Sequence, residues 1–267
     1  MSEPRITAID RLPAIGPAAI CMGVFDGVHR GHVALARTTS RAARERKAAA
    51  VALVFEPHPD EVVRPGTVVP RLAPVAGNLR RLRAAGIDHP LVVRFDAGLR
   101  ALEPAAFLAA MSPAIELRAL VMTPESAFGR NRAGTPEAMR LLGASSGFDL
   151  VVADDVVRDD GVPISSARVR AALGTGDVAT AVRLLGHPLE LVATTRAGNP
   201  GDDARRRLDF GYAPALPAAG RYPVLVRVES GGERVEGTLE VDAGGAWLEA
   251  PAEPGAPQLL IELDAPG

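Results

Sequence analysis

The sequence predicts an α/β fold, in which a parallel sheet covered by helices is followed by a small antiparallel β unit. Two observations carry this prediction. From residue 17 to about residue 157, continuously apolar runs alternate with segments of helical periodicity, which is typical of buried parallel strands joined by helices. Towards the end of the chain, short strand-like runs separated by turns replace the helical pattern.

Five apolar runs are predicted to form the parallel strands, and helix candidates lie between them. The strands are expected at residues 18–22, 49–55, 90–95, 119–122 and 149–153, and the helices at about 32–47, 75–85, 104–112 and 136–143. Crossovers between parallel strands are almost always right-handed, and such sheets bind ligands at the carboxyl ends of their strands. Functional residues are therefore expected in the loops that follow these strands.

A further helix is predicted over residues 178–185, because its pattern ends at Gly186 with Pro188 just beyond. Strand-like alternation begins at 189–196, a polar loop is expected at 197–207, and further strands are expected at 224–228, 235–239 and 259–263. We place a domain boundary after the helix, which divides the chain into residues 1–186 and 187–267.

Composition excludes several classes of protein. The net charge of −2 argues against broad binding to nucleic acid or to a membrane surface. Because Cys21 is the only cysteine, neither an internal disulfide nor a cysteine-based zinc site is expected. The single lysine, Lys47, is not part of a Walker-type phosphate loop. Neither a signal peptide nor an apolar run long enough for a membrane span is present, so we expect a cytoplasmic protein.

The strongest functional signal is residues 23–32, GVFDGVHRGH. Here two histidines, His29 and His32, stand where an apolar strand passes into a helical pattern. A helix N-terminus offers unpaired N–H groups and a partial positive charge, which favour phosphate binding. The glycines let a nucleotide approach the backbone, and the imidazoles can donate hydrogen bonds to phosphate oxygens. The alternative is a tight turn with two surface histidines.

This segment resembles the HxGH signature of the nucleotidyltransferase superfamily, and more narrowly the FMN adenylyltransferase module of the bacterial bifunctional riboflavin kinase/FAD synthetase family. Segments at 55–59, 128–134, 164–170 and 184–188 follow in the order that this family places them, so the resemblance covers about residues 17–188. It implies a Rossmann-like nucleotidyltransferase domain with a parallel sheet, followed by a small antiparallel β-barrel-like domain related to riboflavin kinase.

The resemblance implies that the phosphate of FMN attacks the α-phosphorus of ATP, with Mg²⁺ present, to give FAD and pyrophosphate. Because the attacking phosphate is already anionic, the protein must mainly align two phosphates and neutralise growing charge. His29 and His32 are the expected catalytic pair. The expected nucleotide- and phosphate-binding residues are Gly23, Phe25, Asp26, Gly27, Gly31, Ser165, Ser166, Arg168 and Arg170.

The same resemblance implies a flavin or nucleotide pocket wall made by His58, Pro59, Glu125, Phe128, Gly129 and Arg130. Structural roles stay open beside these: His58 between two prolines can fix a turn, Phe128 can pack a loop, and Ser165 or Ser166 can cap a helix. Asp26 can stabilise the turn, orient a histidine or help to hold Mg²⁺. The expected partners are small-molecule nucleotides and flavins.

The sequence also departs from the family pattern. Residues 123–127 lack the glycine and the first phenylalanine that usually precede the Phe-Gly element, and Ala167 replaces a threonine. Residues 209–214 lack the threonine and asparagine with which riboflavin kinases hold a magnesium-nucleotide, so we expect that riboflavin phosphorylation is lost. Two alternatives to FAD synthesis stay open: a non-catalytic flavin- or nucleotide-binding homologue, and a nucleotidyltransferase that acts on another phosphorylated acceptor.

Overall fold

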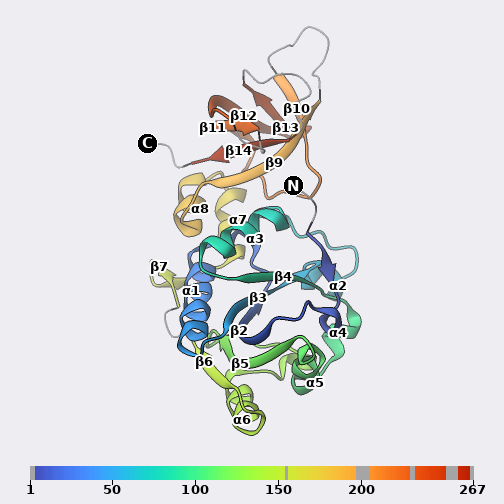
Figure 1. Ribbon diagram of the computed structural model, residues 1–267. Helices are drawn as coiled ribbons and strands as arrows, with labels where there is room; N and C mark the ends of the chain where they lie inside the picture. Colours follow the sequence, from blue (N-terminus) through green and yellow to red (C-terminus); the bar gives the residue numbers. More distant parts are fainter. Residues whose placement is uncertain (1–3, 154–155, 197–204, 229–231, 251–257, 265–267) are drawn as a thin grey trace. The chain divides into compact units, whose positions relative to one another are not determined.

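The apolar runs of the first part of the chain form a six-stranded sheet, and the later runs form a closed barrel (Figure 1). The computed structural model describes residues 4–153, 156–196, 205–228, 232–250 and 258–264. Within them the chain forms two units: a sheet unit, Ser2–Val69 and Asn78–Pro163, and a barrel unit, Pro70–Gly77 and Ile164–Gly267. The predicted α/β fold with a following antiparallel unit is confirmed, whereas the domain boundary at residue 186 stays a prediction.

The sheet is parallel throughout, and its strand order is β1-β4-β3-β2-β5-β6. Its strands are β1 (Ile6–Thr7), β2 (Gly16–Gly23), β3 (Ala49–Glu56), β4 (His89–Arg94), β5 (Ile115–Met122) and β6 (Asp149–Val152). The five predicted strands are confirmed, and β1, which is too short to show periodicity, adds to one edge. Because β2 lies between β3 and β5, the winding of the chain reverses at β2, and its carboxyl end is a topological switch point.

Helices alternate with these strands as predicted. The four expected helices are α1 (Arg30–Glu45), α3 (Val75–Ala84), α5 (Pro104–Met111) and α6 (Pro136–Ser146). Shorter elements that the sequence did not indicate are α2 (Pro59–Val63), α4 (Ala97–Ala101), the 3₁₀ turns η1 (Ile9–Arg11), η2 (Asp26–Val28) and η3 (Arg130–Arg132), and the small hairpin of β7 (Arg158–Asp159) and β8 (Val162–Pro163). Helix α1 begins two residues earlier than expected, which places His29 at its N-cap.

The two faces of the central strands carry side chains of different size. Helix α1 packs against β2, β3 and β5, and the strand residues towards it are small, as at Ala19, Cys21 and Ala52. Cys21 meets Thr39 of α1, and burial raises the pKa of its thiol to about 12, so it behaves as a small apolar residue. The opposite face carries large side chains, such as Ile20 and Leu53, which form the main core. The small residues let α1 lie close to the strands.

The barrel unit is antiparallel, as predicted. It contains α7 (Ser166–Gly174) and α8 (Val178–Leu185), followed by the strands β9 (Leu189–Arg196), β10 (Arg205–Asp209), β11 (Gly220–Val228), β12 (Val235–Asp242), β13 (Gly245–Glu249) and β14 (Leu259–Leu263). The strands close in the order β10-β13-β12-β11-β14-β9. In β9 and β12 alternate residues such as Leu191 and Leu239 are buried and fill the interior, in keeping with the two-residue period of strands, whereas all five residues of β14 are buried.

One expectation about the barrel unit is wrong. Residues 205–207 were expected in a polar loop, but they are the start of β10 and pair with β13. The three consecutive arginines made this strand look like a loop in the sequence. Arg205 and Arg207 lie outside the barrel beside the Trp247 ring, whereas Leu208 is buried. The rest of the expected loop, residues 197–204, lies outside the described residues.

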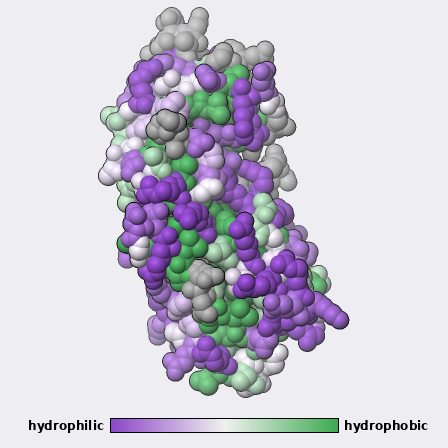
Figure 2. Space-filling model, turned by 90° about the vertical axis from the view of Figure 1, so that its left-hand side faces the viewer, coloured by the Kyte–Doolittle hydropathy of each residue, from purple (hydrophilic) through white to green (hydrophobic). Residues whose placement is uncertain are grey.

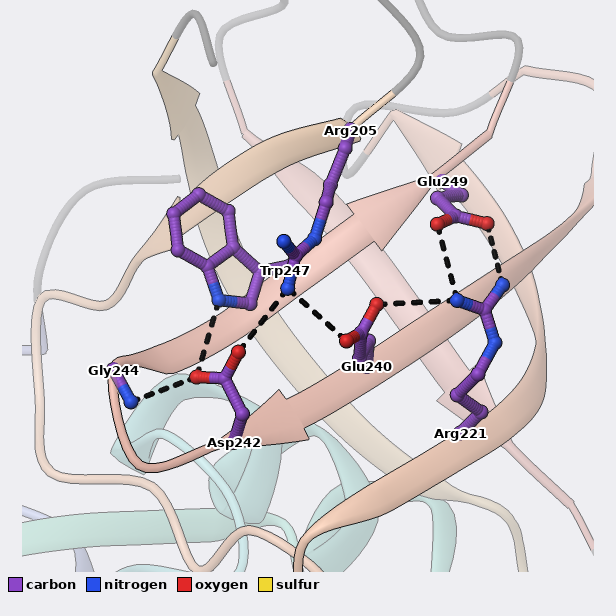
Figure 3. A network of polar contacts seen from close by, with 7 residues as sticks. All are labelled: Arg205, Arg221, Glu240, Asp242, Gly244, Trp247 and Glu249. Carbon is purple, nitrogen blue, oxygen red and sulfur yellow. Dashed lines mark hydrogen bonds and ion pairs between the residues drawn. The ribbon is translucent and has the colours of Figure 1, made fainter. Parts of the chain in front are cut away.

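A ladder of charged residues covers the outside of β10–β13 (Figure 3). Arg205 lies 3.1 Å from both Glu240 and Asp242, and its guanidinium lies 4.5 Å from the centre of the Trp247 ring. Arg221 continues the ladder, 3.1 Å from Glu240 and 2.6 Å from Glu249. Each ion pair of this kind contributes little to stability. Together the contacts show that Arg205 and Arg221 are neutralised by acidic residues of the same unit.

Hydrophilic and hydrophobic side chains are interspersed on the face drawn in Figure 2. In the part of the chain that the structure describes, no helix is both long enough and apolar enough to cross a lipid bilayer. The cytoplasmic location expected from the sequence stays a prediction.

Candidate functional site

The turn that follows β2 has an unusual backbone. Phe25, Gly27 and Val28 all have positive φ, at 53°, 77° and 42°. Glycine adopts this region freely, but for a β-branched residue such as Val28 it is rare and strained. The side chains of Phe25 and Val28 are buried, so packing holds the turn in place. Strain of this kind persists only where the surroundings determine it, and it clusters at functional sites.

His29 ends this turn and caps helix α1. Its Nδ1 atom accepts a hydrogen bond from the backbone N–H of His32, at 3.3 Å, and the residue is only 5% exposed. Serine, threonine, aspartate or asparagine usually fills this position. Because Nδ1 acts as an acceptor, the single proton of the neutral ring is on Nε2. The cap therefore fixes the orientation of the His29 ring, with Nε2 as its protonated nitrogen.

The two imidazoles are stacked on one another. Their ring centres are 3.7 Å apart and their planes differ by 15°, while the Phe25 ring lies 5.1 Å from His32. Burial lowers the pKa of His32 well below its usual 6.5, and the neighbouring His29 lowers it further. His32 is thus neutral near pH 7. Its Nδ1 is buried without a partner, an arrangement that costs stability and is typical of groups kept for a function.

Helix α1 brings further donors to the same place. Its first N–H groups, at Arg30 and Gly31, have no acceptor within the helix, and the helix dipole adds a partial positive charge. The sequence placed the motif correctly at the carboxyl end of a strand, and the sheet order puts that end at the switch point. The histidines, the glycines of the turn and the helix start therefore lie together at a helix N-terminus, where proteins commonly bind anions, and the binding of phosphate by these residues stays a prediction.

Asn78 of α3 also belongs to this arrangement, and sequence reasoning missed it. Its side-chain oxygen accepts a hydrogen bond from the backbone N–H of Gly27, at 3.0 Å, and the residue is 4% exposed. The two residues are 51 positions apart. No local pattern in the sequence marks Asn78, because its role depends on where the fold places α3.

His58 and Pro59 follow β3 at the same edge of the sheet. A cis peptide bond joins Glu56 to Pro57, and His58 then caps α2 by accepting a hydrogen bond from the N–H of Asp60 at 3.1 Å. Pro59 is the first residue of that helix, where its missing N–H is not needed. Both residues thus help to start α2, and their part in a pocket wall stays a prediction.

The segment after β5 holds Glu125 and residues 128–130. The Phe128 ring packs edge-on against Phe107, with centres 5.2 Å apart, at the margin of the main core. Gly129 lies so close to Leu102 and Pro104 that a Cβ atom would be tightly packed, and Arg130 forms an ion pair with Glu103. Glu125 is exposed. These contacts show a packed loop, and a contribution of the segment to ligand binding stays a prediction.

Ser165, Ser166, Arg168 and Arg170 lie in the barrel unit. Ser165 is the N-cap of α7, as expected, and its Oγ accepts a hydrogen bond from the N–H of Arg168 at 3.3 Å. Arg170 donates a hydrogen bond to the carbonyl oxygen of Pro70, at 2.7 Å. The implied contact of these residues with a nucleotide stays a prediction.

Among the described residues, no group of three or more histidine, cysteine, aspartate or glutamate side chains could hold a metal ion. Mg²⁺ needs only one or two protein carboxylates when substrate phosphates supply the other ligands. Asp26, in the turn itself, offers one carboxylate and is 2% exposed, and its assignment as a ligand stays a prediction.

A family model for FAD synthetase matches residues 13–168, which is more than half of the chain and includes the turn and both histidines. The chain belongs to the FAD synthetase family. The resemblance noted in the sequence is thereby confirmed.

Curated relatives of this FAD synthetase family member are similar to it over most of its length. The bifunctional riboflavin kinase/FMN adenylyltransferase of Escherichia coli strain K12 is 34% identical over 214 residues, which cover 78% of this chain and 67% of the relative. The protein of the same description from Listeria monocytogenes is 27% identical, over 78% of this chain and 68% of that protein.

A solved structure has a similar fold. The crystal structure of a macrolide-efflux protein from Streptococcus pneumoniae superposes with a TM-score of 0.83, and the superposition covers 98% of this chain and 91% of that chain. Only 21% of the residues are identical, so this likeness shows the fold alone.

Proposed function

We propose that this chain is an FMN adenylyltransferase, which transfers AMP from ATP to FMN and releases FAD and pyrophosphate. The observation that carries the proposal is the stacked His29–His32 pair at the N-terminus of α1, within the segment that the FAD synthetase model matches. A phosphate oxygen of FMN forms a bond to the α-phosphorus of ATP, and the bond from that phosphorus to the bridging oxygen of the β-phosphate breaks. Pyrophosphate leaves with the electron pair of that bond.

In this reaction the residues of the turn bind and orient phosphates. His29 donates its Nε2–H to a phosphate oxygen, and the first N–H groups of α1 donate to neighbouring oxygens. A neutral His32 supplies a second donor without the cost of burying a full charge. Mg²⁺ bound with the triphosphate would neutralise further charge, and Asp26 would be a ligand from this chain.

We further propose that the barrel unit lacks riboflavin kinase activity. The segment at 209–214, which has neither the threonine nor the asparagine of that enzyme, is engaged in packing within the unit. The Tyr212 hydroxyl accepts a hydrogen bond from the Val192 N–H at 3.4 Å, and the Ala213 carbonyl accepts one from the Arg71 N–H at 2.7 Å. These contacts support a structural role for the segment.

The test uses the whole purified chain with ATP, Mg²⁺ and either FMN or riboflavin, and products are separated by chromatography. FAD and pyrophosphate from FMN are expected, with no FMN formed from riboflavin. Absence of FAD would reject the proposed transfer and favour a binding protein or another phosphorylated acceptor. Formation of FMN from riboflavin would reject the loss of kinase activity.

A further inference from the structure

We infer that Asn78 is a positioning residue, which holds the turn between β2 and α1 in the shape that the proposed reaction requires. The inference rests on the proposed function, but its structural part can be tested without any activity. It starts from the bond between the Gly27 N–H and the Asn78 side-chain oxygen, which is 3.0 Å long and buried.

This bond acts at the middle of the strained turn. Gly27 lies between Phe25 and Val28, and all three have positive φ. The local hydrogen bond from the Val28 N–H to the Phe25 carbonyl, at 3.2 Å, does not by itself select this backbone, because an ordinary turn can form it as well. The Asn78 oxygen does select this backbone, because it is a fixed acceptor outside the segment and holds the Gly27 N–H in one direction.

The position of this turn also determines where the two imidazoles lie. His29 follows Val28 directly and is held by its cap contact with the N–H of His32, while Phe25 packs against the His32 ring. A rotation of the Gly27 peptide would therefore move Phe25 and His29 together. Phosphate transfer depends on donors held within a fraction of an ångström, so the effect of such a movement on turnover is large.

The chain offers a matched control for this contact. Asp88 also uses a side-chain oxygen to accept a hydrogen bond from a distant backbone N–H, that of Ala50, at 2.8 Å. Ala50 lies at the start of β3, so this bond is at the amino end of a strand rather than at the carboxyl end where the turn lies. Asp88→Ala thus removes the same kind of bond without touching the turn.

The experiment compares the wild type, Asn78→Ala, Asn78→Asp and Asp88→Ala by amide hydrogen exchange and by steady-state kinetics. In Asn78→Ala we expect the amides of residues 24–30 to exchange at least about tenfold faster. We expect kcat for FAD formation to fall by about tenfold to a hundredfold, while KM for ATP changes by less than about threefold. Asp88→Ala is expected to leave exchange at 24–30 and kcat unchanged.

Asn78→Asp tests the nature of the contact, because either carboxylate oxygen can accept the Gly27 N–H. Slow exchange at residues 24–30 is therefore expected to return in this variant. If Asn78→Ala does not fold, Asn78→Ser replaces it, since its side chain is one atom shorter and does not reach Gly27. Wild-type exchange and wild-type kcat in the Ala or Ser variant would overturn the inference. A wild-type protein that makes no FAD would overturn the proposed function alone, and the exchange data would still decide the role of Asn78.

Discussion

Replacement of His29 can separate the two roles that the structure gives this residue. His29→Ala removes the N-cap acceptor of α1, which contributes about 1 kcal/mol in comparable helices. It also removes the ring stacked on His32 at 3.7 Å, and aromatic pairs of this kind contribute about 0.5–1.5 kcal/mol. We therefore expect the free energy of unfolding to fall by about 2 kcal/mol. If Nε2–H stabilises the transition state, kcat should fall by about 10²–10³.

His29→Ser is the matched variant, because serine caps helices well but has no imidazole. Its free energy of unfolding should lie about 1 kcal/mol above that of His29→Ala, since the cap is restored. Its kcat should stay as low as that of His29→Ala. Urea unfolding followed by circular dichroism measures the first quantity, and chromatographic detection of FAD measures the second.

Two results would refute this reasoning in different ways. Equal stabilities of the two variants would show that the contact between His29 and the His32 N–H does not cap the helix. A kcat in His29→Ser close to that of the wild type would show that His29 acts only as a cap, and the imidazole would then have no part in catalysis.

Three further predictions follow from the fold. Burial lowers the pKa of His32 in the native state, so the unfolded chain binds more protons than the native protein between that pKa and 6.5. As the pH falls below 6.5, the free energy of unfolding should therefore fall by up to about 1.4 kcal/mol per pH unit through this group. In His32→Gln this pH dependence, measured by urea unfolding, should be flatter. Gly143→Ala places a Cβ against the Phe148 carbonyl oxygen and should lower the free energy of unfolding by about 1–3 kcal/mol. Gly174→Ala, with open space around its Cβ, should not destabilise the protein. Equal effects of the two variants on thermal unfolding would contradict the packing argument. Leu239→Ala, inside the barrel, should lower the free energy of unfolding by about 2–5 kcal/mol, and Leu225→Ala, at a half-exposed position, by much less. Similar losses in chemical unfolding would contradict the assignment of Leu239 to the inside and Leu225 to the outside of the barrel.

The sequence by itself determined the architecture and the place of the candidate site in the chain. Buried strands such as β3 and the α1 helix were predicted because hydrophobic periodicity is a local property that the residues display directly. The glycines and histidines of residues 23–32 were identified for the same reason, since the strand, the turn and the helix start are adjacent in the chain. Where local signals conflicted, as for the arginines that begin β10, the prediction failed, because an exposed strand face has no apolar pattern.

Only the tertiary structure decided how the site is held. The contact from Asn78 to Gly27 joins residues 51 positions apart, and the order of the strands, which places β2 between β3 and β5, comes from long-range pairing. The neutral state of His32 likewise depends on which side chains exclude water from its ring. Such properties arise from contacts between distant segments, whereas the periodicity of a sequence reports only on neighbours, and this is why they could not be predicted from it.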